Sequence, residues 1–191
     1  MSGSPPPPVP PYKPRCRRWK ILKFSSTEVA LIAFFAATYA IGVTFLAPIS
    51  FDPRFQIRVA DAFLPLSIIF GFPAALGLGL GCFIANFFGP YGFIDAVIGG
   101  IANFAACMLA WFIGGDSVKR RFLGCLTETI TITVIVGGYL SLLLGIPIEI
   151  SLLGLFIGSL ISINILGFVL LEALNKKKVV GDILKGRIKA S

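Results

Sequence analysis

Four polar side chains stand near the ends of apolar segments, and they have the clearest capacity for chemistry: Arg58, Asp61, Asn86 and Asp95. Two aromatic residues, Tyr91 and Phe93, are interleaved with them. A few guanidinium, carboxylate and amide groups among aromatic rings are typical of a pocket that binds and orients a small molecule. The pattern therefore predicts a binding site.

Each of these groups also has a simpler structural interpretation. Charges at the ends of membrane helices can lie in water, and aromatic rings gather at membrane interfaces. Arg58 and Asp61 stand three residues apart, a spacing at which two side chains on one helix can pair. Asp95 opens a helical segment, where a carboxylate stabilises the N-terminal dipole. Asn86 lies in an apolar run and needs a hydrogen-bond partner.

Catalytic and metal-binding motifs are scarce in this sequence. Histidine is absent, and no two of the four cysteines have C-x-x-C spacing, so a metal site is not expected. There is no G-x-S-x-G motif and no phosphate-binding loop ending in G-K-[ST]. A pair formed by Asp61 and Asp95 is the one arrangement left for acid–base chemistry, and nothing else supports it. We therefore expect neither an enzyme nor a bound cofactor or metal.

The composition is that of a membrane protein. Of 191 residues, 56% are hydrophobic and only 14% are charged, and the mean hydropathy is +0.90. About 20 apolar residues in a helix span the hydrocarbon core of a bilayer. We expect an all-α bundle of about six transmembrane helices, over residues 29–51, 62–94 (two shorter helices divided at Gly71, Phe72 and Pro73), 96–115, 122–145 and 150–171.

The distribution of Lys and Arg predicts the orientation. Fifteen of the 17 lie before the first helix, after the fourth or beyond the sixth, whereas Arg54 and Arg58 fall on the other side. Because cytoplasmic segments carry the excess of Lys and Arg, both termini are expected in the cytoplasm. Residues 1–24 are predicted to be a disordered, proline-rich basic tail, 25–175 the six-helix membrane domain and 176–191 a second basic tail. The net charge of +8 then fits anionic membrane lipid and requires no nucleic acid.

This topology brings the polar candidates together. Arg58, Asp61, Asn86 and Asp95 come from separate stretches of sequence, yet six crossings place all four at the outer face, opposite to the two tails. The predicted pocket therefore opens outward.

The first helix combines a start signal with a stripe of small residues. Ser25 and Glu28 have capping-box spacing, so the helix is predicted to begin there. Small residues at helical spacing let another helix approach closely. The stripe is interpreted equally well as internal packing and as a docking face for a partner subunit, and its members are Ala33, Ala36, Ala37 and Ala40.

The stretch 56–115 resembles the queuosine-precursor transporter (QueT) family, the substrate-binding S components of energy-coupling factor (ECF) importers. That family shows R-V-x-E-A-L-x-x-L-P, then G-L-x-x-G-C-x-x-A-N, then a D-x-x-x-G-x-x-A element. Here these are residues 58–65, which are two residues shorter than the family element, 77–86 and 95–102. Asp61 stands where the family usually has glutamate, which shortens the side chain by one methylene group. Asn103, just beyond the third element, is not part of the pattern.

The resemblance implies a 7-deazaguanine ligand, together with a coupling membrane subunit and ATPase subunits as partners. The guanine-like edge offers N–H donors to a carboxylate and a carbonyl acceptor to a cation, and aromatic rings can stack on the heterocycle. Asp61 or Asp95 would then accept, Arg58 donate, and Tyr91 or Phe93 stack. The alternative is a stand-alone transporter or channel for another vitamin-like solute. That function predicts a charge at a helix centre, and only Glu128 comes near one, although the topology places it close to the cytoplasmic end.

Overall fold

The computed structural model describes residues 24–52 and 57–175, and these residues form an all-α bundle. The two predicted tails lie largely outside the described residues. The elements are all helical, η1 being a 3₁₀-helix and η2 a π-helix: α1 (Ser26–Phe45), α2 (Ala47–Ser50), η1 (Val59–Leu66), α3 (Ser67–Phe70), α4 (Phe72–Phe87), α5 (Gly92–Ile113), α6 (Val118–Leu144), α7 (Ile148–Ser159), η2 (Leu160–Gly167) and α8 (Phe168–Asn175).

The predicted start of the first helix is confirmed. The Ser25 hydroxyl accepts a hydrogen bond from the backbone N–H of Glu28, and the Glu28 carboxylate accepts one from the backbone N–H of Ser25. The helix does not continue over the predicted 29–51, because α1 ends at Phe45 and the short α2 follows with Pro48 in its first turn. Proline lacks an N–H and favours a new helix start at that position.

The break predicted near residues 71–73 is also confirmed. Gly71 has φ +67°, a left-handed conformation that favours glycine, and α4 begins at the next residue, Phe72, with Pro73 in its first turn. A Cβ atom at position 71 would lie 3.1 Å from the Trp111 ring. Backbone conformation and lack of space both therefore require glycine between the two short helical pieces.

Four helices among the described residues are long and apolar enough to cross a membrane: Ser26–Phe45, Gly92–Ile113, Val118–Leu144 and Ile148–Asn175. Two shorter apolar helices, Val59–Phe70 and Phe72–Phe87, lie between the first and second of them. The last of the four is continuous through α7, η2 and α8. The prediction of a helical membrane bundle with about six apolar segments is therefore confirmed.

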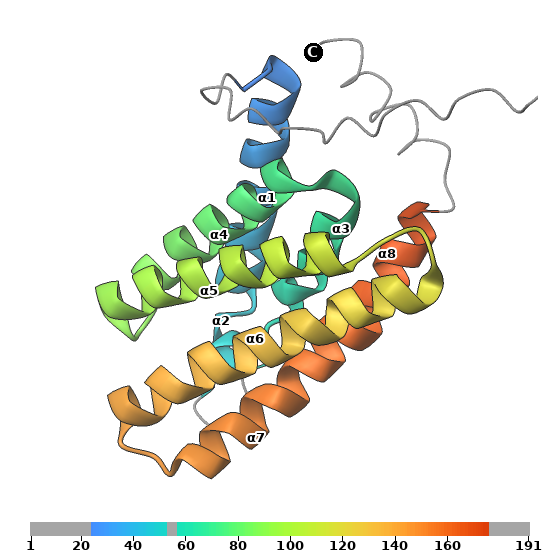
Figure 1. The fold of residues 1–191 in the computed structure, drawn as a ribbon. Coiled ribbons are helices and arrows are strands. Elements are labelled where there is room, and N and C mark those ends of the chain that lie inside the picture. Colours follow the sequence, from blue (N-terminus) through green and yellow to red (C-terminus); the bar gives the residue numbers. More distant parts are fainter. Residues whose placement is uncertain (1–23, 53–56, 176–191) are drawn as a thin grey trace, which may run out of the picture.

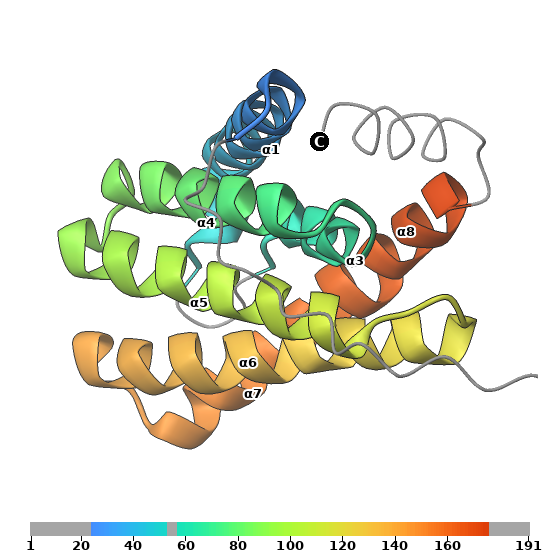
Figure 2. The ribbon, with the colours of Figure 1, turned by 45° about the horizontal axis from the view of Figure 1, so that its top comes forward.

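The helices pack in chain order, α1 against α4, α4 against α5, α5 against α6 and α6 against α7, while η1 contacts α1, α4, α5, α6 and η2 in the centre. Figures 1 and 2 both show the α4–α5 turn and the α6–α7 turn on one side of the bundle, with the α5–α6 connection and the end of α8 on the other. This alternation positions the residues near the α4–α5 turn against the C-terminal half of α6.

Two glycines of α4 allow its close approach to α1. A Cβ atom at Gly77 would lie 2.6 Å from the carbonyl oxygen of Ile32, and one at Gly81 would lie 2.6 Å from that of Ala36. The alanine stripe of α1 is consequently divided. Ala36, which packs against α4, and Ala40 are half-buried in the bundle. Ala33 and Ala37 are exposed.

We expect Gly81→Ala to lower the thermal stability of the detergent-purified protein. The new methyl group meets backbone rather than a movable side chain, and overpacking costs about 1–3 kcal/mol, which exceeds the roughly 0.5–1 kcal/mol that alanine contributes to a helix. Gly138→Ala is the matched control, because nothing lies within 4 Å of a Cβ there. Equal melting temperatures for the two variants would contradict the α1–α4 packing.

Candidate functional site

Asp61 is buried between η1 and α1. Its side chain is only 3% exposed. The hydroxyl of Tyr39, which is fully buried on α1, donates a hydrogen bond of 2.6 Å to Oδ1 of Asp61. Because η1 packs against α1, a carboxylate in its first turn meets the inward face of the first helix. Tyr39 therefore fixes the position of this carboxylate.

Arg58 precedes η1 and is also buried, with 5% exposure. Its Nε donates to the carbonyl oxygen of Ser50 at 3.4 Å, its Nη1 lies 3.8 Å from Sγ of Cys82, and its guanidinium carbon is 5.5 Å from the centre of the Phe51 ring. Within the described residues it forms no direct ion pair with Asp61. Arg58 has extended φ and ψ, so the helical pairing considered for residues 58 and 61 does not apply.

Asn86 and Asp95 meet where α4 and α5 pack together. Both side chains are fully buried. Nδ2 of Asn86 donates a hydrogen bond of 3.2 Å to the backbone carbonyl oxygen of Asp95. Gly99 leaves space for the Asn86 side chain, because a Cβ atom at position 99 would lie 2.5 Å from Nδ2. On the other side, the hydroxyl of Tyr139 of α6 donates to Oδ1 of Asp95. Three helices thus position this carboxylate.

Tyr91 lies near Asp95, whereas Phe93 lies on the outside of the bundle. The Tyr91 hydroxyl donates to the carbonyl oxygen of Phe51 at 2.7 Å, and the two rings meet edge to face. Partial burial, and secondarily the charge of Asp95, raise the pKa of Tyr91, so its hydroxyl stays a donor. Phe93 is 62% exposed and packs against Phe83 and Phe87 on the outside of the bundle.

We call the polar residues around the two acids the carboxylate cluster. All but the half-buried Tyr139 are buried, and the members are Tyr39, Ser50, Arg58, Asp61, Cys82, Asn86, Asp95 and Tyr139. Four of its buried polar atoms have no hydrogen-bond partner among the described residues: Oγ of Ser50, Nη2 of Arg58, Oδ1 of Asn86 and Oδ2 of Asp95. Leaving such atoms unsatisfied is costly. The cluster therefore offers donor and acceptor groups that a polar ligand can satisfy.

Sequence reasoning did not identify Tyr39, Ser50, Cys82 and Tyr139 as members of this site. A tyrosine in an otherwise apolar helix was the available signal, since a buried hydroxyl needs a partner. Its partner could not be assigned without the helix packing. Within the described residues, no group of three or more His, Cys, Asp or Glu side chains lies close enough to hold a metal ion.

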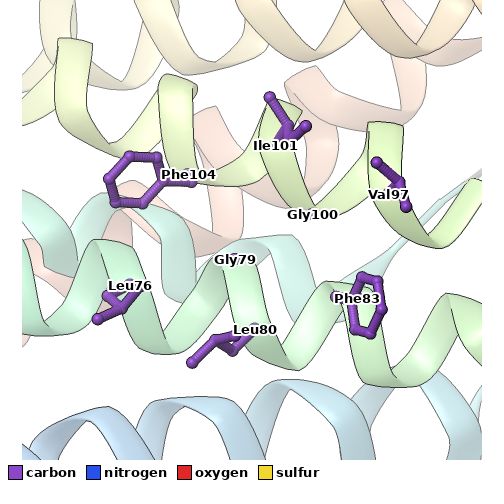
Figure 3. A pocket seen from close by; sticks show the side chains of 8 residues that line it. All are labelled: Leu76, Gly79, Leu80, Phe83, Val97, Gly100, Ile101 and Phe104. Carbon is purple, nitrogen blue, oxygen red and sulfur yellow. The ribbon is translucent and has the colours of Figure 1, made fainter.

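A separate groove lies between α4 and α5 (Figure 3). Its volume is about 240 Å³, and it is lined almost entirely by apolar atoms of Leu76, Gly79, Leu80, Phe83, Val97, Gly100, Ile101 and Phe104. None of these residues belongs to the carboxylate cluster. A groove of this composition suits hydrocarbon and lacks the polar groups that would orient a polar solute.

The bundle is thus a helical membrane protein with a buried polar site. The chain belongs to the QueT transporter family, whose model matches residues 29–176. It is therefore a transport protein rather than a member of an enzyme family. Comparisons with curated proteins and with solved structures gave no match.

Proposed function

We propose that the chain is the substrate-binding S component of an ECF importer and that it takes up a 7-deazaguanine precursor of queuosine. Membership of the QueT transporter family supports the transport class. We further propose that the chain works with a coupling membrane subunit and ATPase subunits. The observation that carries it is the set of four unsatisfied polar atoms in the carboxylate cluster.

These atoms define what the ligand must present. Nη2 of Arg58 requires an acceptor, whereas Oδ2 of Asp95 and Oδ1 of Asn86 require donors. A lactam next to an amino group, as on a guanine-like edge, carries one carbonyl acceptor and adjacent N–H donors. Asp95 suits the donor edge better than Asp61, because Oδ2 of Asp95 is one of the four unsatisfied buried atoms and no oxygen of Asp61 is among them. Tyr91 is the better stacking candidate, because Phe93 faces away from the cluster.

The cluster is closed in this structure. Its principal residues, Arg58, Asp61, Asn86 and Asp95, are at most 5% exposed. The hydrogen bond from Tyr91 to Phe51 joins the α4–α5 turn to the residue after α2. In the proposed mechanism this bond breaks to admit the ligand and re-forms behind it.

Calorimetry on the purified chain tests the ligand. Titration with a 7-deazaguanine carrying the amino–lactam edge is expected to show binding, and adenine, which lacks that edge, is expected to show none. Absence of binding by the wild type would remove the deazaguanine assignment while leaving the transport class intact.

The proposed topology has six crossings with both termini in the cytoplasm. Cysteines introduced by Arg54→Cys or Glu149→Cys are expected to react with an impermeant thiol reagent added outside intact cells, and one introduced by Arg120→Cys is expected to stay unlabelled. Glu149 and Arg120 are both exposed, so accessibility does not bias the comparison. The native cysteines 82, 107 and 125 are buried, and Cys16 is replaced by serine. The reverse labelling pattern would invert the bundle and place the cluster on the wrong side for import.

A stand-alone transporter is the second candidate function. A stand-alone transporter that is driven by a coupled proton needs an ionisable group inside the membrane that binds and releases that proton. Glu128 is the eleventh of the 27 residues of α6 and is fully buried, which places an acid inside the bundle rather than at its edge. This observation favours the alternative.

A further inference from the structure

Glu128 is a carboxyl group buried away from the carboxylate cluster. It has 0% exposure and forms no ion pair with a Lys or Arg of the described part of the chain. Its Oε1 lies 3.3 Å from the hydroxyl of Ser67, and its Oε2 has no hydrogen-bond partner among the described residues. An ionised carboxylate in a low-dielectric interior requires a counter-charge or several donors. The described surroundings supply at most one donor.

The hydroxyl of Ser67 is shared between two oxygens. It lies 3.2 Å from the carbonyl oxygen of Cys107 and 3.3 Å from Oε1 of Glu128. A serine hydroxyl has one hydrogen, and a carbonyl oxygen can only accept. When Ser67 donates to Cys107, its contact with Glu128 is a hydrogen bond only if Glu128 carries a proton and donates it. Both short contacts are therefore satisfied together by a neutral Glu128.

Among the residues that the structure describes, the groups that face Glu128 do not offer it a positive charge. Asp61 of η1 and Cys107 of α5 are the ionisable groups that interact with it across the bundle, and Cys125 interacts with it along α6. Its neighbour Thr129 donates a 2.6 Å hydrogen bond to Oδ1 of Asn164 in the π-helix, a neutral contact. An added negative charge at Glu128 would be repelled by the acid on η1, which disfavours the ionised form further.

The same 3₁₀-helix connects Glu128 with the carboxylate cluster. Asp61, Leu64 and Ser67 are spaced three residues apart, which aligns them on one face of a 3₁₀-helix and its continuation. At one end of this face Asp61 contacts Tyr39, and at the other end Ser67 contacts Glu128. Between them, the carbonyl oxygen of Leu64 lies 3.8 Å from Sγ of Cys107. A change at Glu128 thus acts on the element that carries Asp61.

We propose that Glu128 is an intramembrane proton-binding site, occupied at neutral pH, whose proton holds η1 and α3 against α6 through Ser67. The ligand of this site is a proton, and the site is distinct from the one proposed for the imported solute. Its occupancy does not depend on which solute is carried or on whether an ATPase module is present. If the chain works as a stand-alone transporter, Glu128 is the group that would exchange the coupled proton.

Infrared spectroscopy of the full chain in lipid tests the proposal without any solute. At pH 7 the spectrum of the wild type minus that of Glu128→Gln is expected to show the carbonyl band of a protonated carboxylic acid. The subtraction removes any contribution from Asp61 and Asp95. Glu172→Gln is the matched control, because Glu172 pairs with Arg121 through contacts of 2.6 and 2.9 Å and should contribute only carboxylate bands. A carboxylate signal from Glu128 would overturn the proposal.

A second measurement keeps the test decisive if Glu128→Gln folds poorly. The chain has four glutamates, at positions 28, 128, 149 and 172. Incorporating ¹³C-glutamate into the wild type shifts the bands of these four residues alone. We expect an isotope-shifted acid band at pH 7 from Glu128. The other three glutamates are not expected to give this band, because Glu28 caps α1, Glu149 is exposed and Glu172 is ion-paired. The absence of such a band would show that no glutamate carries a proton and would refute the site.

Discussion

Asp95→Ala is expected to weaken binding of a 7-deazaguanine by about 30- to 1,000-fold, or roughly 2–4 kcal/mol. The proposed ligand donates hydrogen bonds to Oδ2 of Asp95, which lacks a partner among the described residues. Without the carboxylate, those ligand donors stay unpaired in a closed site. Asp61→Ala should also reduce affinity. Each variant additionally removes the acceptor of a tyrosine hydroxyl, that of Tyr39 for Asp61 and that of Tyr139 for Asp95.

Two controls test whether the effect is specific to the cluster. Glu149→Ala removes an exposed carboxylate from the first turn of α7, outside the cluster, and Arg120→Lys keeps the charge of an exposed residue in the first turn of α6. Calorimetry should give wild-type affinity for both. If Asp61→Ala and Asp95→Ala also kept full affinity, the carboxylates would not form part of the binding site.

Ala37→Trp is expected to lower transport by roughly tenfold or more, equivalent to about 1.4 kcal/mol of lost docking free energy, while ligand binding by the isolated chain persists. Ala33 and Ala37 form an exposed strip on α1, where a partner helix can approach closely. A tryptophan there would hold that helix away. Uptake by cells and calorimetric binding to the purified variant provide the two readouts.

Val134→Trp is the control for the size of the introduced side chain. Val134 is 62% exposed on α6, so a tryptophan there meets lipid rather than the α1 strip. Its transport should match that of the wild type. Loss of ligand binding in Ala37→Trp, with assembly intact, would mean that the strip serves internal packing instead.

The fold was predictable where a local rule applied. The capping box at Ser25 and Glu28 and the break at Gly71 depend on backbone chemistry within a few residues, and both occur as expected. The 3₁₀ geometry of Val59–Leu66 and the π geometry of Leu160–Gly167 were not expected from hydropathy. Those segments contact each other in the bundle, and hydropathy carries no information on which element a segment will meet.

The site was predictable as a set of polar residues but not as a set of contacts. Asp61, Asn86 and Asp95 were identifiable because polar groups in apolar segments require partners. Their partners, Tyr39 and Tyr139, are 22 and 44 residues away from the acids they contact, so only tertiary packing brings them together. Glu128 was expected close to the cytoplasmic end of its helix. Its burial depends on the packing of η1 against α6, which hydropathy does not specify.

Purification of the tagged chain from its native membranes, followed by identification of what remains bound, tests the central proposal most directly. We predict that a coupling membrane subunit and ATPase subunits remain bound to the wild type, and that Ala37→Trp loses them while Val134→Trp retains them. Recovery of the wild-type chain without any ATPase, together with solute uptake when it is reconstituted alone in vesicles lacking ATP, would contradict the assignment as an S component.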